Sequence, residues 1–162
     1  MKDWILPYRE FRRLHCRAYR AQQRDQSEVV GVLLSGARRR LTLSFLRNHS
    51  DSPGHFVVET ADVTLERRRA RSRRLRFVGL FHSHPLSEAT LGPGDRRAAT
   101  LNWLQLVYDV CGREARLWRV CRRAGRRYTT EARLRVERRR IMGPANGPLE
   151  RAGSAGRSTP SR

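Results

Sequence analysis

Residues 79–95, GLFHSHPLSEATLGPGD, decide how the rest of the sequence is interpreted. An apolar run leads into His-Ser-His-Pro, and an Asp follows a loop rich in turn-forming residues. His82 and His84 are two positions apart at the predicted end of a strand, so their side chains point to the same face. Pro85 ends that strand, as expected where a sheet opens into a cleft. The stretch therefore predicts two imidazoles that converge on one point.

The chemistry of these side chains indicates a metal centre. Two neutral imidazoles and the carboxylate of Asp95 are typical ligands of a catalytic Zn²⁺ that keeps water at its fourth position. Such a water needs a general base beside it, and Glu28 is the acidic residue that heads a buried apolar strand, SEVVGVLLSG. Each feature alone has an ordinary explanation: an incidental His pair, a helix cap or a solvated carboxylate. Together, and in this order, they predict a catalytic zinc site.

Hydrophobic periodicity outside this stretch predicts an α/β fold, a mixed β-sheet flanked by helices. We expect helices over 7–25 and from Asp95 onward, and a helix or a mobile loop over 61–75. Strands are expected over 27–36, 39–48, 55–60, 76–81, 106–110 and 114–121, and a strand or short helix over 126–136. The segment 1–138 is expected to form a single domain. A disordered tail rich in Gly, Pro, Ser and Arg is expected over 139–162.

Charge is the most unusual bulk property of the chain. Of 35 basic residues only Lys2 is a lysine, and the formal net charge of the 162 residues is +20. This charge favours anionic partners, namely nucleic acid, an anionic membrane or an acidic protein. The arginines are scattered over every predicted element, however, which is typical of a GC-rich genome rather than of a nucleic-acid docking stripe. A nucleic-acid role is therefore not expected.

The remaining composition favours a reduced, cytoplasmic protein. Three cysteines without paired spacing predict no disulfide framework, and Cys111 and Cys121 are expected to be buried thiols. No apolar run is long enough to span a bilayer, and no signal-peptide core is visible. His15, His49 and His55 have no ligand partner in the sequence.

The combined pattern resembles the JAMM-type metallopeptidases, which are MPN-domain (JAB/Mov34-type) proteins. That family's motif is a Glu on an early strand, then His-Ser/Thr-His-Pro, then seven residues counted from that Pro, then Ser-x-x-Asp. Glu28 lies in EVVGVLL, residues 82–85 match directly, and Asp95 falls on the last position. The resemblance covers residues 8–121 and implies a cytidine-deaminase-like MPN domain of the prokaryotic stand-alone form. It implies one Zn²⁺ per chain, held by His82, His84 and Asp95, with Glu28 as the catalytic base.

One position departs from the family motif. The motif Ser, whose hydroxyl by resemblance helps to hold the oxyanion, is replaced by Gly92. Loss of one such donor can cost about 10²–10³ in rate. The backbone N–H of Gly92 or Gly94, or the hydroxyl of Ser87 or Thr90, could substitute, and Ser83 is a further candidate for oxyanion or supporting contacts.

The resemblance implies a zinc-dependent isopeptidase or peptidase. It would hydrolyse the amide bond after the C-terminal tail of a ubiquitin-like protein, in deconjugation or precursor processing. Glu28 would take a proton from the attacking water and return it to the leaving amine. The implied partners are a ubiquitin-like protein, its conjugates and E1- and E2-like proteins, with no membrane. The arginines of 60–75 could contact an acidic substrate surface or simply form a solvated helix.

Two alternatives to the enzyme are open. A catalytically inactive MPN scaffold would explain Gly92 as loss of an active-site residue. A DNA-associated protein would explain the charge of +20, and it ranks last.

Overall fold

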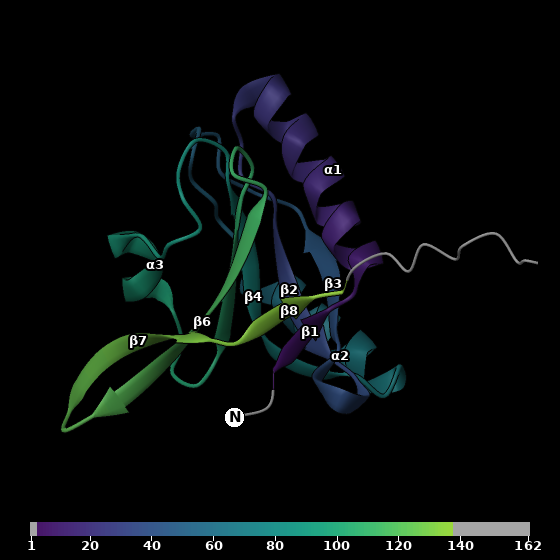
Figure 1. Cartoon of the computed structure of the whole chain (residues 1–162), viewed down its shortest axis with the longest axis vertical. Coiled ribbons are helices and arrows are strands. Elements are labelled where there is room, and N and C mark those ends of the chain that lie inside the picture. Colours follow the sequence, from purple (N-terminus) through teal and green to yellow (C-terminus); the bar gives the residue numbers. More distant parts are fainter. Residues whose placement is uncertain (1–2, 138–162) are drawn as a thin grey trace, which may run out of the picture.

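A six-stranded mixed sheet organises the computed structural model, which describes residues 3–137 of the chain (Figure 1). The strand order is β3-β2-β4-β5-β6-β7, and β4 and β5 form its parallel pair while the other neighbours are antiparallel. A separate parallel pair joins β1 and β8. The strands are β1 Trp4–Leu6, β2 Val30–Ser35, β3 Leu41–Leu46, β4 Arg76–His84, β5 Leu104–Asp109, β6 Glu114–Arg123, β7 Arg126–Ala132 and β8 Leu134–Val136.

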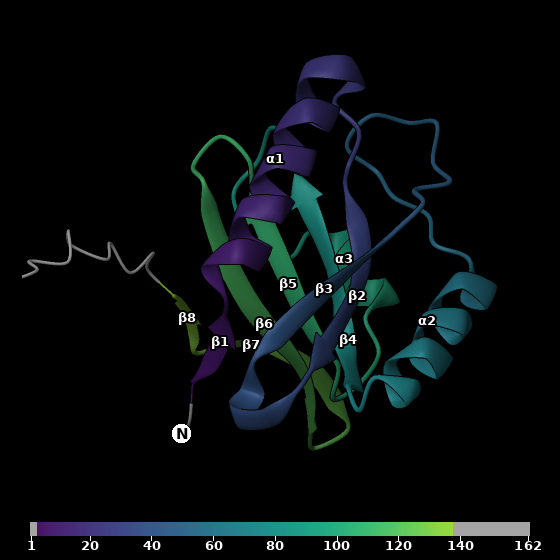
Figure 2. The same cartoon turned by 90° about the vertical axis from the view of Figure 1, so that its right-hand side faces the viewer.

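The two faces of the sheet are covered by different elements (Figure 2). The 18-residue helix α1, Tyr8–Asp25, packs Leu14 and Ala18 into the main core with residues such as Leu33 and Phe81. Side chains alternate along a strand, so the neighbours of Leu33 in β2 point to the other face. There they pack against Ala70 of α2, Thr60–Ser72.

The connection between β4 and β5 covers the rest of that second face. Parallel strands need a crossover, and here residues 85–103 provide it, with one short helix, α3, Pro93–Ala98. Ala89 and Leu91 of this crossover pack with Val107 of β5, and Trp118 of β6 lies against them. The end of β4 therefore lies under the crossover, with α2 farther along the same face.

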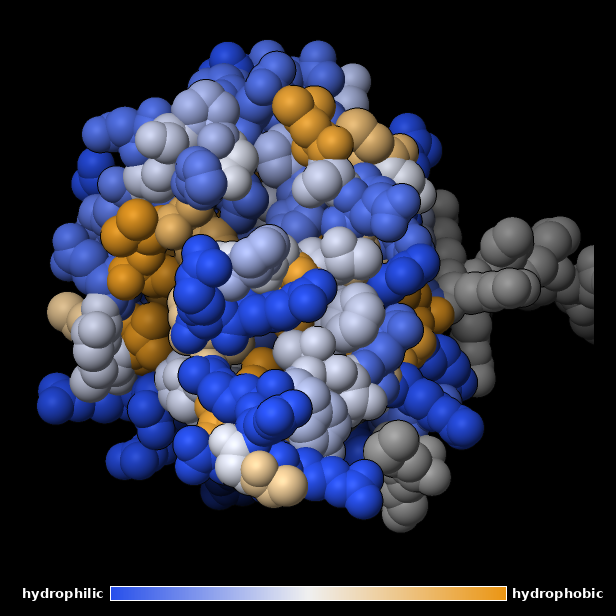
Figure 3. All heavy atoms as spheres, turned by 90° about the vertical axis from the view of Figure 1, so that its left-hand side faces the viewer, coloured by the Kyte–Doolittle hydropathy of each residue, from blue (hydrophilic) through white to orange (hydrophobic). Residues whose placement is uncertain are grey.

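The surface on the α3 side is largely hydrophilic, with small separated hydrophobic patches (Figure 3). Large contiguous apolar patches mark interaction sites on many proteins. This face therefore presents mainly polar and charged groups to solvent.

Most predicted elements are confirmed, and three expectations are corrected. Residues 55–60 are not a strand: 55–59 form a loop, in which Val57 is 52% exposed and has no neighbouring strand, and Thr60 begins α2. The helix expected to open at Asp95 starts at Pro93 and ends at Ala98, so Asp95 is its third residue and not its N-cap. The residues expected as one strand or helix over 126–136 form two strands, β7 and β8.

Further expectations concerned the segment 61–75, the cysteines, the C-terminal tail and membrane-spanning helices. The segment 61–75 is largely helical, as α2. Cys111 is exposed because it lies in the turn after β5, and Cys121 is half-buried, so the expected burial is wrong for Cys111. The predicted tail, 139–162, lies outside the described residues. Among residues 3–137, no helix is long and apolar enough to cross a membrane.

Candidate active site

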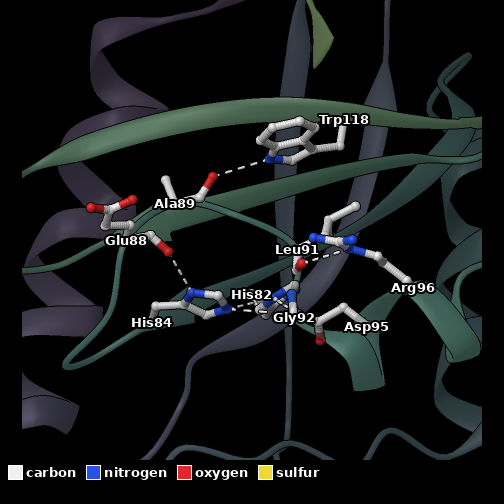
Figure 4. A network of polar contacts seen from close by, with 9 residues as sticks. All are labelled: His82, His84, Glu88, Ala89, Leu91, Gly92, Asp95, Arg96 and Trp118. Carbon is white, nitrogen blue, oxygen red and sulfur yellow. Dashed lines mark hydrogen bonds and ion pairs between the residues drawn. The ribbon is translucent and has the colours of Figure 1, made fainter. Parts of the chain in front are cut away.

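The carboxyl end of β4 brings three potential ligand atoms together beneath the crossover (Figure 4). The Nε2 atoms of His82 and His84 lie 3.1 Å apart. The Oδ2 atom of Asp95, from α3, lies 3.5 Å from the first and 3.8 Å from the second. The structure thus brings together the three residues that the sequence singled out as ligands.

This triangle fits a tetrahedral metal ion. A Zn²⁺ ion about 2.0–2.1 Å from each nitrogen and oxygen ligand keeps those ligands about 3.3 Å apart. His84 Nδ1 lies 2.7 Å from the carbonyl oxygen of Glu88, and an N–H there leaves the lone pair of Nε2 free for a metal. A contact of this kind fixes the tautomer of many metal-binding histidines.

The surroundings of His82 also favour a role as a metal ligand. Its ring is fully buried, stacks on Phe56 at a centroid distance of 4.8 Å, and has no hydrogen-bond partner at Nδ1. Burial lowers the pKa of His82 and favours the neutral imidazole that a metal requires, although Asp95 opposes this shift. Burying a polar ring with one nitrogen unpaired costs free energy, and a ligand bond at Nε2 would offset that cost.

Without a metal, Asp95 and His84 shift each other's pKa values in opposite directions. Burial raises the pKa of Asp95, but contacts from His82, His84 and the Gly92 N–H, 2.8 Å from Oδ2, hold the pKa well below its usual range. Burial lowers the pKa of His84, but Asp95, Glu88 and Glu28 outweigh it, so the net shift is upward. The Asp95 carboxylate is ionised, and its negative charge favours a proton on His84. A metal ion bound between the two side chains would take the place of that proton.

Glu28 lies beside this cluster, immediately before β2, and is 7% exposed. Its Oε2 atom is buried and has no hydrogen-bond partner. Burial raises the pKa of Glu28 to about 7; His84 opposes this rise and Asp95 adds to it. Glu28, His84, Gly92 and Asp95 line one cavity of about 460 Å³. A carboxyl group that titrates near neutrality at the wall of a cavity is suited to proton transfer.

Ser83 supports the Glu28 segment from the opposite face of the sheet. Its Oγ accepts a hydrogen bond from the N–H of Val29 at 2.9 Å, and its own N–H donates to the Val29 carbonyl at 2.9 Å. The residue is fully buried. These contacts fit a supporting role, and they do not fit direct contact with a substrate.

Asn48 is a supporting residue that the sequence did not reveal. Its amide group donates to the carbonyl oxygens of Glu28 and His55, both at 3.0 Å. Its Oδ1 accepts the N–H groups of Ser50 at 2.9 Å and Val57 at 3.0 Å. One side chain thus closes the loop 48–57 and fixes it to the backbone of Glu28. An Asn before a turn is the available sequence signal, but it does not identify these partners.

The crossover is fixed by side chains that reach its backbone (Figure 4). Trp118 Nε1–H donates to the Ala89 carbonyl at 3.1 Å, and Arg96 Nε–H donates to the Leu91 carbonyl at 2.9 Å. These bonds anchor the middle of the segment that leads from β4 to Asp95.

The structure narrows the choice of groups that could replace the motif Ser. The N–H of Gly92 is engaged with Asp95, and Thr90 does not line the cavity. Gly94 and Ser87 do line it. A Cβ atom added to Gly92 would lie 3.2 Å from Asp95 Oδ2, so a side chain at this position fits with a small shift.

The arginines of α2 do not line this cavity. Arg67 lies over the ring of Phe77, and Arg69 pairs with Glu66 at 2.7 Å. The interpretation of this segment as a solvated helix is therefore favoured over a role at the cavity.

A second group of potential ligands lies outside the cavity. His49 Nδ1 is 3.5 Å from Glu59 Oε1, and its Nε2 is 3.3 Å from Asp62 Oδ2. Sequence spacing did not predict these partners because Glu59 and Asp62 lie on the far side of the loop. His15 also has a partner, the hydroxyl of Tyr108 at 2.7 Å.

Comparisons with known proteins agree with this fold and motif. A family model of prokaryotic homologues of the JAB domain matches residues 13–121. A desampylase from Pyrococcus furiosus is 35% identical over 57 residues, which are 35% of this chain and 41% of the archaeal protein. The solution structure of protein DSY2949 from Desulfitobacterium hafniense superposes with a TM-score of 0.67 at 18% identity. That alignment covers 82% of this chain and 92% of the other, and it supports the fold alone. Because the family model spans more than half of the sequence, the chain belongs to the prokaryotic JAB-domain family.

Proposed function

We propose that the protein is a zinc-dependent isopeptidase or peptidase that hydrolyses the amide bond after the C-terminal tail of a ubiquitin-like protein. One observation carries the proposal: the ligand atoms of His82, His84 and Asp95 converge within 3.8 Å of one another, beside the buried carboxyl of Glu28. Membership of the JAB-domain family and the partial match to an archaeal desampylase support it. The proposed partners are a ubiquitin-like protein, its conjugates and the E1- and E2-like proteins of the same system.

His82, His84 and Asp95 would hold the ion. Bound Zn²⁺ would supply Lewis-acid polarisation of the scissile carbonyl and acidify a water molecule. Glu28 accepts the proton of the attacking water at its unpaired Oε2 and delivers it to the leaving amine. A pKa of about 7 suits both halves of this task, because Glu28 is then neither a very weak base nor a very weak acid at neutral pH.

The developing oxyanion needs a hydrogen-bond donor in addition to the metal. The backbone N–H of Gly94 and the hydroxyl of Ser87 are the proposed donors, because both residues line the cavity and the Gly92 N–H is engaged. Ser83 and Asn48 do not touch the substrate in this mechanism, and they hold the Glu28 segment in place.

Glu28→Gln tests the proposal because it keeps the shape of the side chain and removes its proton chemistry. We expect purified wild type and variant each to bind about one zinc per chain. Cleavage of a fusion to a ubiquitin-like protein should fall by about 10²–10⁴ in the variant. Glu59→Gln, at an exposed carboxylate outside the cavity, is the matched control and should cleave normally. A wild-type protein that binds no zinc would contradict the proposal.

The inactive scaffold is the second candidate, and Gly92 is the observation that favours it. Gly92→Ser separates the two, because the added side chain fits beside Asp95 with a small shift. For an active enzyme we expect measurable wild-type cleavage that the substitution increases by at most about 10²–10³. An inactive wild type that becomes active only with Ser at this position would establish the scaffold.

A further inference from the structure

A second cavity, of about 640 Å³, shares Glu28 with the candidate active site. It lies between the last turns of α1 and the end of β3. Helix α1 contributes Arg17, Arg20 and Arg24 to its lining, and Arg47, which follows β3, contributes a fourth guanidinium. We call this cavity the arginine groove. Because Glu28 lines both cavities, the arginine groove adjoins the candidate active site at this residue.

Two of the four arginines are already engaged within the protein. Arg17 lies 4.2 Å from the centroid of the Phe45 ring, and Arg24 pairs with Asp25 at 2.9 Å. Arg20 and Arg47 are exposed and have no ion pair with any residue among 3–137. The arginine groove therefore has uncompensated positive charge on both of its walls.

We propose that the arginine groove binds an extended, acidic segment of the protein substrate. This inference rests on the proposed function, since it assigns a recognition element to the same substrate. Arginine presents a planar fork of donors that matches a carboxylate, and such pairs give specificity as well as attraction. The segment is extended because it must run past both walls of the groove and reach Glu28.

One feature of the lining favours a polypeptide over a single-stranded nucleic acid as the occupant. The aromatic residue of the lining is Phe45, whose ring already lies beneath Arg17. Single-stranded nucleic acids need exposed rings on which their bases can stack.

The groove should affect substrate capture and not the chemical step. Charges at the edge of an interface mainly change association rate and salt dependence. Loss of the arginine charges should therefore raise KM and leave kcat nearly unchanged.

A binding assay tests the proposal independently of catalysis. The probe is a fluorescein-labelled peptide of alternating glutamate and valine, and its counterpart carries glutamine at every glutamate. In fluorescence anisotropy, wild type and Glu28→Gln should both bind the glutamate peptide, and both should prefer it to the glutamine peptide. Arg20→Gln/Arg47→Gln should weaken binding by about 3- to 30-fold, which corresponds to the combined free energy of two partly exposed ion pairs.

Matched variants make the result specific to this groove. Arg68→Gln/Arg71→Gln removes the same charge from exposed positions of α2 and should bind like wild type. Arg20→Lys/Arg47→Lys keeps the charge and should restore most of the binding, which a folding defect would not allow. Binding should also weaken between about 50 and about 300 mM salt.

Three outcomes would overturn the proposal: equal binding of both peptides, equal loss in the α2 control, or tighter binding of a labelled single-stranded DNA that depends on Arg20 and Arg47. Peptide binding is measured without cleavage. A wild-type protein that cleaves nothing would therefore contradict the proposed function, whereas the binding assay would still test the arginine groove.

Discussion

Two groups of histidine and carboxylate side chains in this protein look alike in composition and differ in what they can do. At the end of β4, both histidines direct Nε2 toward Asp95, and the three atoms lie within 3.8 Å of one another. At the start of α2, His49 directs Nδ1 toward Glu59 and Nε2 toward Asp62. One ring cannot offer both of its nitrogens to a single ion, so the second group is a bridge in which His49 contacts a different carboxylate at each nitrogen, forming ion pairs only when the ring is protonated.

Burial separates the two groups further. His82 is fully buried and His84 is 8% exposed, whereas Glu59 is exposed and His49 and Asp62 are partly exposed. In the buried group, polar atoms removed from water gain most from a strong ligand. In the exposed group, water already solvates each charge, and salt screens their attraction. Residue type is therefore a weak guide to a metal site. The direction and burial of the ligand atoms distinguish the candidate metal site from the exposed group.

The largest expected effect is on metal binding. His82→Ala removes one of three protein ligands, and zinc affinity should fall by at least about 100-fold. This loss corresponds to the part of the binding free energy that one ligand contributes at a typical zinc site. His49→Ala should bind zinc like wild type. Competition with a coloured chelator measures both affinities. A loss of zinc in His49→Ala that equals the loss in His82→Ala would contradict the distinction between the two groups.

Stability against pH gives the next largest effect, in metal-free protein. The pKa of Glu28 is raised from 4.5 to about 7 in the folded state, so the unfolded chain releases this proton first as pH rises. Stability is lost from about pH 4.5 up through about pH 7, and the loss is on the order of 1–3 kcal/mol. Chemical denaturation at several pH values, compared between wild type and Glu28→Gln, isolates this contribution.

Glu28 also raises the pKa of His84, so this contribution includes the coupling between the two side chains. Glu59→Gln, at an exposed carboxylate outside the cavity, is the control substitution. Identical pH curves for wild type and Glu28→Gln would mean that Glu28 ionises normally in the folded protein.

Asn48 bonds to the carbonyl of Glu28, which lies beside the buried group, and it precedes His49 of the exposed group in the chain. Its removal should have an intermediate effect. Asn48→Asp keeps the acceptor oxygen and loses the donor to the carbonyls of Glu28 and His55. We expect kcat to fall about 10-fold, the lower range for loss of a supporting contact, with zinc content unchanged. Ser50→Ala, which keeps the backbone N–H bonded to Asn48, is the control. An unchanged kcat in Asn48→Asp would show that Glu28 holds its place without this side chain.

The smallest effect is expected from the exposed bridge itself. His49→Gln should change the free energy of unfolding by less than about 1 kcal/mol, because exposed ion pairs contribute little. Urea denaturation at low and high salt measures this change. A loss of several kcal/mol would show that the bridge holds the loop 48–57 much more firmly than exposed ion pairs usually do.

The sequence predicted the elements in which apolar side chains face a core and polar side chains face solvent. Helix α1 and strands β2, β3 and β4 follow their hydrophobic patterns closely because their apolar residues face the cores on either side of the sheet. The same regularity located His82 and His84 on one face. The pairing of Glu28 with this strand end came from the family motif, because no spacing in the sequence places β2 beside β4.

The errors arose where tertiary contacts override local pattern. Residues 55–60 have an apolar, strand-like composition, but Asn48 bonds to the His55 carbonyl and the Val57 N–H, and no strand lies beside Val57. Asp95 looked like a helix cap, yet Gly92 takes that position and the carboxylate turns back toward its N–H. The arginine groove joins α1 to the end of β3, a proximity that the sequence does not show.

The short helix α3 has a consequence for how quickly an ion could be exchanged. None of its residues is buried, whereas β4 is held by ladders to both β2 and β5. Segments with few buried contacts open locally at much lower cost than the whole fold. Swinging α3 outward would withdraw Asp95 while leaving both histidines in place. The residence time of a bound ion is then governed by this local opening, so chelators could strip the metal from a protein whose sheet stays intact.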